Sequence, residues 1–266
     1  MPATRRPISA NTDEDDRQPC VKGESTVARS SGKGTLHLIP VPLGPSPVRD
    51  VLPETVIQCA ARLRHFIAEN ARSARAFLKT LPCELPLREI DIRELDEHTP
   101  PDALPQLLAP LLAGEDVGLI SEAGCPAVAD PGAPLVALAH EAGIPVAPLV
   151  GPSSILLALM VCGLPAQNFA FHGYLPAKDD QRRKRIVELE NESRRMARTQ
   201  VFIETPYRNR QMLEALIATC SARTRIAIAT DLTLPGQRIM VLRGDDWKCR
   251  PLPDIDRRPT VFLLLA

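Results

Sequence analysis

Two loops rich in glycine, proline and serine are the part of this sequence best suited to hold a small ligand. The first, residues 121–132, reads SEAGCPAVADPG and follows a short apolar run at 117–120. The second, residues 151–154, reads GPSS and follows another apolar run at 144–150. Small residues let backbone N–H and C=O groups come close to a bound molecule. The two loops predict a ligand site built mainly from backbone groups, although such loops also occur at ordinary strand ends.

The side chains in and around these loops show no pattern typical of covalent or metal-dependent catalysis. Ser153 and Ser154 lie in GPSSI, which is not the GxSxG elbow of a serine hydrolase. Cys125 could be a reactive thiol, but no base can be named beside it, so a small loop residue is the favoured interpretation. The five histidines have no metal-ligand spacing, and neither GxGxxG nor a Walker lysine motif occurs. We expect no bound metal.

Two groups of basic residues could contact phosphates. One lies at the start of an expected helix within 178–198 and comprises Lys178, Arg182, Arg183, Lys184 and Arg185. The other is Arg72 and Arg75, which are three residues apart and share a helix face. Three glutamates follow the first group, so a solvated helix of mixed charge is the favoured interpretation and a phosphate-binding patch is the alternative.

Alternating strands and helices must position these loops. The strand at 117–120, a helix at 134–142 and the strand at 144–150 form a βαβ unit, which implies a parallel sheet with ligands at the C-terminal strand ends. Upstream, strands are expected at 35–41, 65–68 and 87–92, with helices at 48–63, 73–81 and 105–113. Downstream, strands at 169–175, 200–204, 225–230, 241–244 and 260–265, with helices within 178–198 and at 211–218, indicate a smaller mixed α+β domain.

The length and composition limit the class of protein. The chain has 266 residues, enough for two modest domains, which we place at 34–150 and 151–266 after a polar, disordered tail at 1–33. Lys plus Arg and Asp plus Glu number 32 each, so no global field favours nucleic acid. Seven cysteines without a CxxC pair suggest free thiols. With no long apolar run and no signal peptide, we expect a cytoplasmic protein without a membrane span.

The loop 121–132 and seven other segments resemble the ribosomal RNA small-subunit methyltransferase I family. LISEAGCPAVADPG is similar to that family's LISDAGTPGISDPG. The other segments follow in the family's order across 34–266: IPVPLG, AENARSAR, GPSSILLAL, FAFHGYLP, RRKR, FIETPYR and ATDLT. The resemblance implies two α/β domains of the tetrapyrrole (corrin/porphyrin) methylase type. It also implies S-adenosylmethionine (SAM) as methyl donor, bound between the domains, and a homodimer.

The resemblance further implies roles for particular residues. Those expected to bind SAM are Pro42, Leu43, Gly44, Gly124, Cys125, Pro126, Val128, Ser153, Ser154, Ile155, Glu204 and Ala229. A ribose 2′-hydroxyl acceptor has a high pKa and needs a closely placed proton acceptor. Glu69 and Glu122 are the candidates for that role, with helix or loop capping as the alternative for each. The two basic groups would contact RNA.

Substitutions relative to the family pattern are concentrated where the acceptor is expected. Glu122 replaces the usual Asp, Cys125 replaces Thr, and Asn70-Ala71 replaces Asp-Thr, which indicates a divergent paralogous branch. Three functions stay open. The chain is a ribose 2′-O-methyltransferase acting on ribosomal RNA, a small-molecule methyltransferase of the tetrapyrrole type, or a SAM-binding protein without catalysis.

Overall fold

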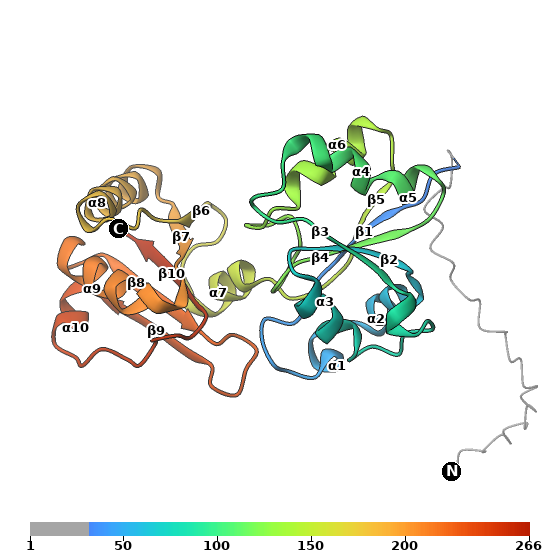
Figure 1. Ribbon diagram of the computed structural model, residues 1–266. Coiled ribbons are helices and arrows are strands. Elements are labelled where there is room, and N and C mark those ends of the chain that lie inside the picture. Colours follow the sequence, from blue (N-terminus) through green and yellow to red (C-terminus); the bar gives the residue numbers. More distant parts are fainter. Residues whose placement is uncertain (1–31) are drawn as a thin grey trace, which may run out of the picture. The chain divides into compact units, whose positions relative to one another are not determined.

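Two five-stranded sheets organise residues 32–266, the part of the chain that the computed structural model describes (Figure 1). The first sheet has the order β3-β2-β4-β1-β5, and all of its neighbouring strands run parallel. The second has the order β6-β7-β10-β8-β9, with β6 and β7 parallel and the other pairs antiparallel. The expected fold class, a parallel sheet followed by a mixed α+β part, is confirmed. The predicted tail lies outside the described residues except for its last two positions.

The first sheet carries helices on both faces. Its strands are β1 (Leu36–Ile39), β2 (His65–Ala68), β3 (Asp91–Glu94), β4 (Val117–Ile120) and β5 (Val146–Pro148). One face is covered by α1 (Val48–Val51), α2 (Glu54–Arg62) and α3 (Ala71–Leu78), and the other by α4 (Leu104–Leu107), α5 (Ala109–Leu112) and α6 (Ala133–Glu141). Phe66 packs into the first core and its neighbour Ile67 into the second, because successive strand residues point to opposite faces.

Prolines explain most differences between the expected and observed elements of this half. The helix expected at 48–63 is divided into α1 and α2, because Pro53 keeps Leu52 extended, with φ −115° and ψ 134°. The helix expected at 105–113 is divided into α4 and α5, each with a proline in its first turn. The strand expected at 87–92 is wrong: a short 3₁₀ turn, Leu87–Glu89, comes first and β3 begins at Asp91.

The second sheet is covered by one helix on one face and three on the other. Its strands are β6 (Phe169–Tyr174), β7 (Thr199–Ile203), β8 (Arg225–Thr230), β9 (Arg238–Arg243) and β10 (Thr260–Leu265). The apolar helix α7 (Ser154–Cys162) packs on one face through Ala158 and Leu159. The opposite face is covered by α8 (Asp179–Met196), α9 (Asn209–Thr219) and α10 (Gly244–Lys248), with Trp247 fully buried there. No helix between residues 32 and 266 is long and apolar enough to span a bilayer.

Candidate functional site

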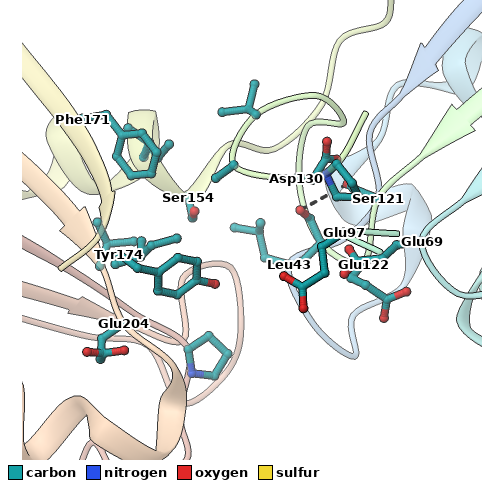
Figure 2. A pocket seen from close by; sticks show the side chains of 18 of the residues that line it. Leu43, Glu69, Glu97, Ser121, Glu122, Asp130, Ser154, Phe171, Tyr174 and Glu204 are labelled. Carbon is teal, nitrogen blue, oxygen red and sulfur yellow. Dashed lines mark hydrogen bonds between the residues drawn. The ribbon is translucent and has the colours of Figure 1, made fainter. Parts of the chain in front are cut away.

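A cavity of about 910 Å³ lies at the carboxyl ends of the strands of the first sheet and is also lined by the second sheet (Figure 2). The loops after β1, β2, β3 and β4 contribute Leu43, Glu69, Glu97 and Glu122. Phe171, Tyr174 and Glu204 face them from β6 and the end of β7. This edge of a parallel sheet is where ligands bind, and the volume lies near the upper end of the range for small-molecule sites.

Backbone and thiol contacts tie together the loops that follow β1, β4 and β5. Val41 N–H donates to the Gly124 carbonyl oxygen at 2.9 Å, and Gly124 N–H donates back at 3.1 Å. The Cys125 Sγ donates to the Pro152 carbonyl oxygen at 3.4 Å. Burial raises the pKa of the Cys125 thiol, which keeps it protonated and able to donate. The favoured interpretation of Cys125, a small loop residue, agrees with this environment.

Asp130 holds the glycine- and proline-rich loop after β4 in a strained conformation. Its Oδ1 accepts from the N–H groups of Ala127 at 2.7 Å and Gly132 at 2.8 Å. Ala127 and Ala129 have φ of 63° and 60°, in the left-handed region, which costs about 1–3 kcal/mol for each residue other than glycine. Burial raises the pKa of Asp130, although the two N–H groups oppose this shift. The loop is therefore fixed in position before any ligand arrives.

The cavity is lined by acidic side chains and by no Lys, Arg or His from the described part of the chain. Its acidic residues are Glu69, Asp96, Glu97, Glu122, Asp130, Glu204 and Asp231. Burial raises the pKa of Glu69, and the negative charges of Glu122, Asp130, Glu97 and Asp96 raise it further. Because several negative carboxylates share a partly enclosed space, the cavity favours cations and disfavours phosphates.

Glu204 lines this cavity, but its carboxylate is buried beneath the surface. Its side chain is fully buried, and Oε1 accepts from Thr205 N–H at 2.7 Å and from the Arg208 guanidinium at 2.6 and 3.0 Å. The other oxygen, Oε2, has no hydrogen-bond partner within residues 32–266. A buried acceptor left unsatisfied costs free energy, whereas the paired oxygen anchors the end of β7 to Arg208.

The structure brings most of the residues predicted to act in catalysis or to bind SAM together at this cavity. Eight of them line it: Leu43, Glu69, Glu122, Val128, Ser154, Ile155, Glu204 and Ala229. Pro42 and Gly44 instead line a smaller cavity of about 310 Å³, which shares Leu43, Ser121 and Glu122 with the large one.

Four residues expected to bind SAM line neither cavity: Gly124, Cys125, Pro126 and Ser153. Gly124 and Cys125 instead contact the loops after β1 and β5, and direct contact of these four residues with SAM stays a prediction. Ser153 caps α7 by accepting from Leu156 N–H at 3.5 Å. These residues therefore position the lining and do not form it.

Asp96, Glu97, Asp130, Phe171, Tyr174 and Asp231 line the cavity but were not selected from the sequence. Asp96 and Glu97 were missed because β3 was predicted to end too early. A strand that ends at Glu94 places them at the carboxyl edge of the sheet, where ligands bind. Asp231 comes directly after β8, and that position could have identified it. Phe171 and Tyr174 looked like ordinary residues of an alternating strand.

The basic residues at the start of α8 do not form the expected open patch. Arg182 is only 4% exposed, and its guanidinium donates to the Ala177 carbonyl at 3.0 Å and to Asp179 at 2.6 Å. Arg183 donates to the other oxygen of Asp179 at 2.7 Å, and Arg185 pairs with Glu188 at 3.1 Å. The prediction that Arg182 contacts RNA is therefore wrong. Lys178, Arg183 and Lys184 are exposed but line neither cavity.

Arg72 and Arg75 are exposed on α3, beside both cavities, and neither forms an ion pair with a carboxylate of residues 32–266. Asn70 begins this helix, and its Oδ1 accepts from the N–H groups of Arg72 at 2.8 Å and Ser73 at 3.3 Å. Asn70 thus serves as an effective N-cap where the resembling family has Asp. The Ser73 hydroxyl in turn donates to the Glu122 carboxylate.

Comparisons with known proteins agree with this architecture. A profile described as Tetrapyrrole (Corrin/Porphyrin) Methylases matches residues 53–246. Ribosomal RNA small subunit methyltransferase I of Xylella fastidiosa (strain Temecula1 / ATCC 700964) is 36% identical over 204 residues, covering 76% of this chain and 70% of that protein. The protein of the same name from Micromonospora olivasterospora is 36% identical over 219 residues, covering 82% and 64%.

A third relative of that name, from Vibrio cholerae serotype O1 (strain ATCC 39315 / El Tor Inaba N16961), is 34% identical over 139 residues, covering 52% and 47%. The chain thus spans between about half and 70% of the length of these relatives. Among solved structures, the methyltransferase CobJ has a TM-score of 0.57 at 21% identity, covering 88% of this chain and 94% of that one. This likeness concerns the fold.

Proposed function

This chain belongs to the tetrapyrrole (corrin/porphyrin) methylase family and is a methyltransferase, and from that premise we propose that it methylates a ribose 2′-hydroxyl of ribosomal RNA with SAM as donor. The name shared by its relatives supports RNA as acceptor. A cytoplasmic location and a homodimer belong to the same proposal. The observation that carries it is the acidic cavity at the carboxyl edge of the first sheet.

The charge and lining of the cavity fit SAM. SAM carries a sulfonium and an ammonium group, which the acidic lining attracts. Arg208 and Arg258 pair with Glu204 and Asp231, so the attraction comes from the other five carboxyl groups of the lining. Leu43, Ile155 and Ala229 offer apolar surface to an adenosine. When bound, SAM supplies an electrophilic methyl group whose transfer breaks a carbon–sulfur bond and leaves the electron pair on sulfur.

The chemical task of the chain's own residues is to position the acceptor hydroxyl and accept its proton. Glu69 is suited to this task, since burial and neighbouring carboxylates raise its pKa and make it a stronger base. Glu122 stands beside it, held by the Ser73 hydroxyl. The proton of the hydroxyl passes to one of these carboxylates as the oxygen bonds to the methyl carbon. Positioning supplies much of the remaining acceleration.

The test begins with SAM binding by the full chain, measured by calorimetry with a chelator present. We expect binding without added metal, and no heat at millimolar SAM would contradict the proposal. Radiolabelled SAM is then offered with small-subunit ribosomal RNA from a strain lacking the gene, and mass spectrometry locates the methyl group. Transfer to components of a metabolite extract but to no RNA would replace the RNA proposal with the small-molecule function.

The homodimer is proposed from exposed apolar side chains on α7. Leu156 is 54% exposed and Met160 76% exposed, and these two residues are four apart, on one helix face. Exposed apolar patches of this kind mark interaction surfaces, and a second copy of the chain is the occupant proposed here. Sedimentation should give a dimer for the wild type and a monomer for Met160→Glu. A wild-type monomer at micromolar concentration would refute this part.

A further inference from the structure

The smaller cavity, of about 310 Å³, lies between the loop after β1 and helix α3. Its walls are largely apolar and include Val48, Phe77 and Ile120. Polar groups are few: the hydroxyls of Ser46, Ser73, Thr80 and Ser121 and the carboxylate of Glu122. The Ser46 hydroxyl has no hydrogen-bond partner within residues 32–266. The volume lies at the lower end of the range for ligand sites, and the lining suits one small, mostly apolar group with a polar edge.

The two cavities meet at Glu122. Leu43, Ser121 and Glu122 line both of them, and the Glu122 carboxylate accepts from the Ser73 hydroxyl on the wall of the smaller one. Figure 2 shows Glu122 next to Glu69, on the side of the large cavity opposite Tyr174. A molecule that occupies the smaller cavity therefore places its adjoining atoms beside the two candidate proton acceptors.

A cationic helix face borders the smaller cavity on the outside. Arg72, Arg75 and Lys79 are spaced at three and four residues, so they share one face of α3 and its C-terminal end. All three are exposed, and none pairs with a carboxylate of residues 32–266. The large cavity is acidic and repels phosphates, whereas this face attracts them. The charges thus separate where a phosphate can lie from where a neutral group can enter.

We propose that the smaller cavity receives one unstacked nucleobase of the RNA acceptor, while the flanking phosphates lie on Arg72, Arg75 and Lys79. This inference rests on the proposed function. The base enters beside Phe77, an aromatic surface of the kind on which extruded bases stack. The ribose attached to that base then stands at Glu122, where the two cavities meet. Enzymes that modify a nucleotide within a structured nucleic acid commonly extrude it in this way.

The first experiment fills the cavity with a tryptophan. Ala76 lines it and is exposed, so Ala76→Trp should block the base without disturbing the core; Ala218→Trp, exposed on α9 outside both cavities, is the matched control. We expect Ala76→Trp to keep the wild-type SAM affinity and to lower kcat/KM for small-subunit ribosomal RNA by at least about tenfold. The control should keep both values. Wild-type kcat/KM in Ala76→Trp would overturn the inference and leave the proposed function standing.

The second experiment removes the phosphate contacts. The triple variant Arg72→Ala/Arg75→Ala/Lys79→Ala should bind RNA more weakly, with a log–log salt slope reduced by up to about 0.7 for each lost contact. Lys248→Ala/Arg250→Ala, two exposed cations near the end of α10, should leave the slope unchanged. An unchanged slope in the triple variant would overturn the placement of the phosphates. A wild-type chain that binds SAM but methylates no RNA would instead refute the proposed function and, with it, this inference.

Discussion

Glu69 is the residue whose environment says most about the chemistry of the cavity. Burial and four neighbouring acidic side chains raise its pKa, so the folded chain takes up a proton there more readily than the unfolded chain. The charged form of Glu69 therefore opposes folding at neutral pH. Natural proteins keep such unfavourable charges where the chemistry needs them, which is consistent with a proton acceptor at this position.

Glu69→Gln should separate stability from activity. At pH 7 the melting temperature should rise by a few degrees at most, because a repelled charge is removed. Below the ordinary glutamate pKa of 4.5 the carboxyl is neutral in both states, so the gain should disappear. Methyl transfer should fall by about 10²–10⁴-fold if Glu69 accepts the proton, with SAM still bound. Calorimetric melting at two pH values and single-turnover assays measure these effects; an active variant would transfer the role to Glu122.

Gly124 tests how the loops are held. Its φ of +77° lies in the left-handed region, and a Cβ would stand 3.2 Å from the Leu43 side chain and 3.4 Å from the Pro152 carbonyl oxygen. Gly163 has a similar φ of +61° at the end of α7, with nothing within 4 Å of an added Cβ. Gly124→Val and Gly163→Val should both lose about 1–3 kcal/mol of stability from backbone strain.

Only the Gly124 variant should also bind SAM poorly, because Leu43 and the loop after β5 must move to accommodate it. Denaturant titration and calorimetry on the two purified variants make this comparison. Equal SAM affinities for both would show that the junction of the loops after β1, β4 and β5 is not needed to shape the cavity.

At the scale of elements, α8 shows how a charge pattern can mislead. Four basic residues in succession, Arg182 to Arg185, suggested a phosphate-binding patch, but Asp179 and Asp180 occupy the first turn of the helix and complement its dipole. The hydrogen bonds from Arg183 and Arg182 hold the pKa of Asp179 below its ordinary value. These ion pairs join residues within the first turns of α8, so only some of the basic side chains there are available to an outside partner.

Arg182→Ala should therefore lower the melting temperature, as the loss of a structural residue does. It removes a buried guanidinium that donates to Asp179 and to the Ala177 carbonyl, and charged hydrogen bonds of this kind contribute about 1.5–3 kcal/mol each. Lys184→Ala, two positions further on and exposed, is the control and should melt within about 2 °C of the wild type. Equal melting temperatures for the two variants would contradict a structural role for Arg182.

The strands and loops of the cavity were largely predictable, whereas its acidity was not. Apolar runs placed β2, β4 and β8 at their observed bounds and β1 to within two residues, because buried strands need continuous apolar side chains. β3 was misplaced, since DIRE is polar and lies at the edge of its sheet, and with it Asp96 and Glu97 were missed. Helix α7 was not anticipated, because SILLALMVC is apolar on all sides and has no helical period.

At the scale of the whole molecule, a formal net charge of zero conceals a strong separation of charge. Acidic residues from the loops after five strands meet at one cavity, and cations that pair with no carboxylate of residues 32–266 lie on the outer face of α3. Sequence distance explains why composition could not reveal this, since Glu69 and Asp231 are 162 positions apart in the chain. The electrostatic field in the cavity therefore depends on how the fold brings distant residues together.

The pH dependence of SAM binding should report that field directly. The raised pKa values of Glu69 and Asp130 mean that these carboxyls begin to gain protons at a higher pH than ordinary carboxyls do. Each proton taken up removes negative charge that attracts the sulfonium and ammonium groups, so SAM affinity should fall as the pH is lowered from 7 toward 5. Among the described residues, no histidine lines the cavity, but His98 Nε2 lies 3.6 Å from the carboxylate of Glu97, so variants are needed to assign the loss to Glu69. Glu69→Gln should flatten the profile of affinity against pH measured by calorimetry, and Glu214→Gln, a partly exposed carboxyl on α9, should not. A wild-type affinity that stays constant between pH 7 and pH 5 would show that the carboxylates do not attract the ligand and that SAM is held by backbone and apolar contacts alone.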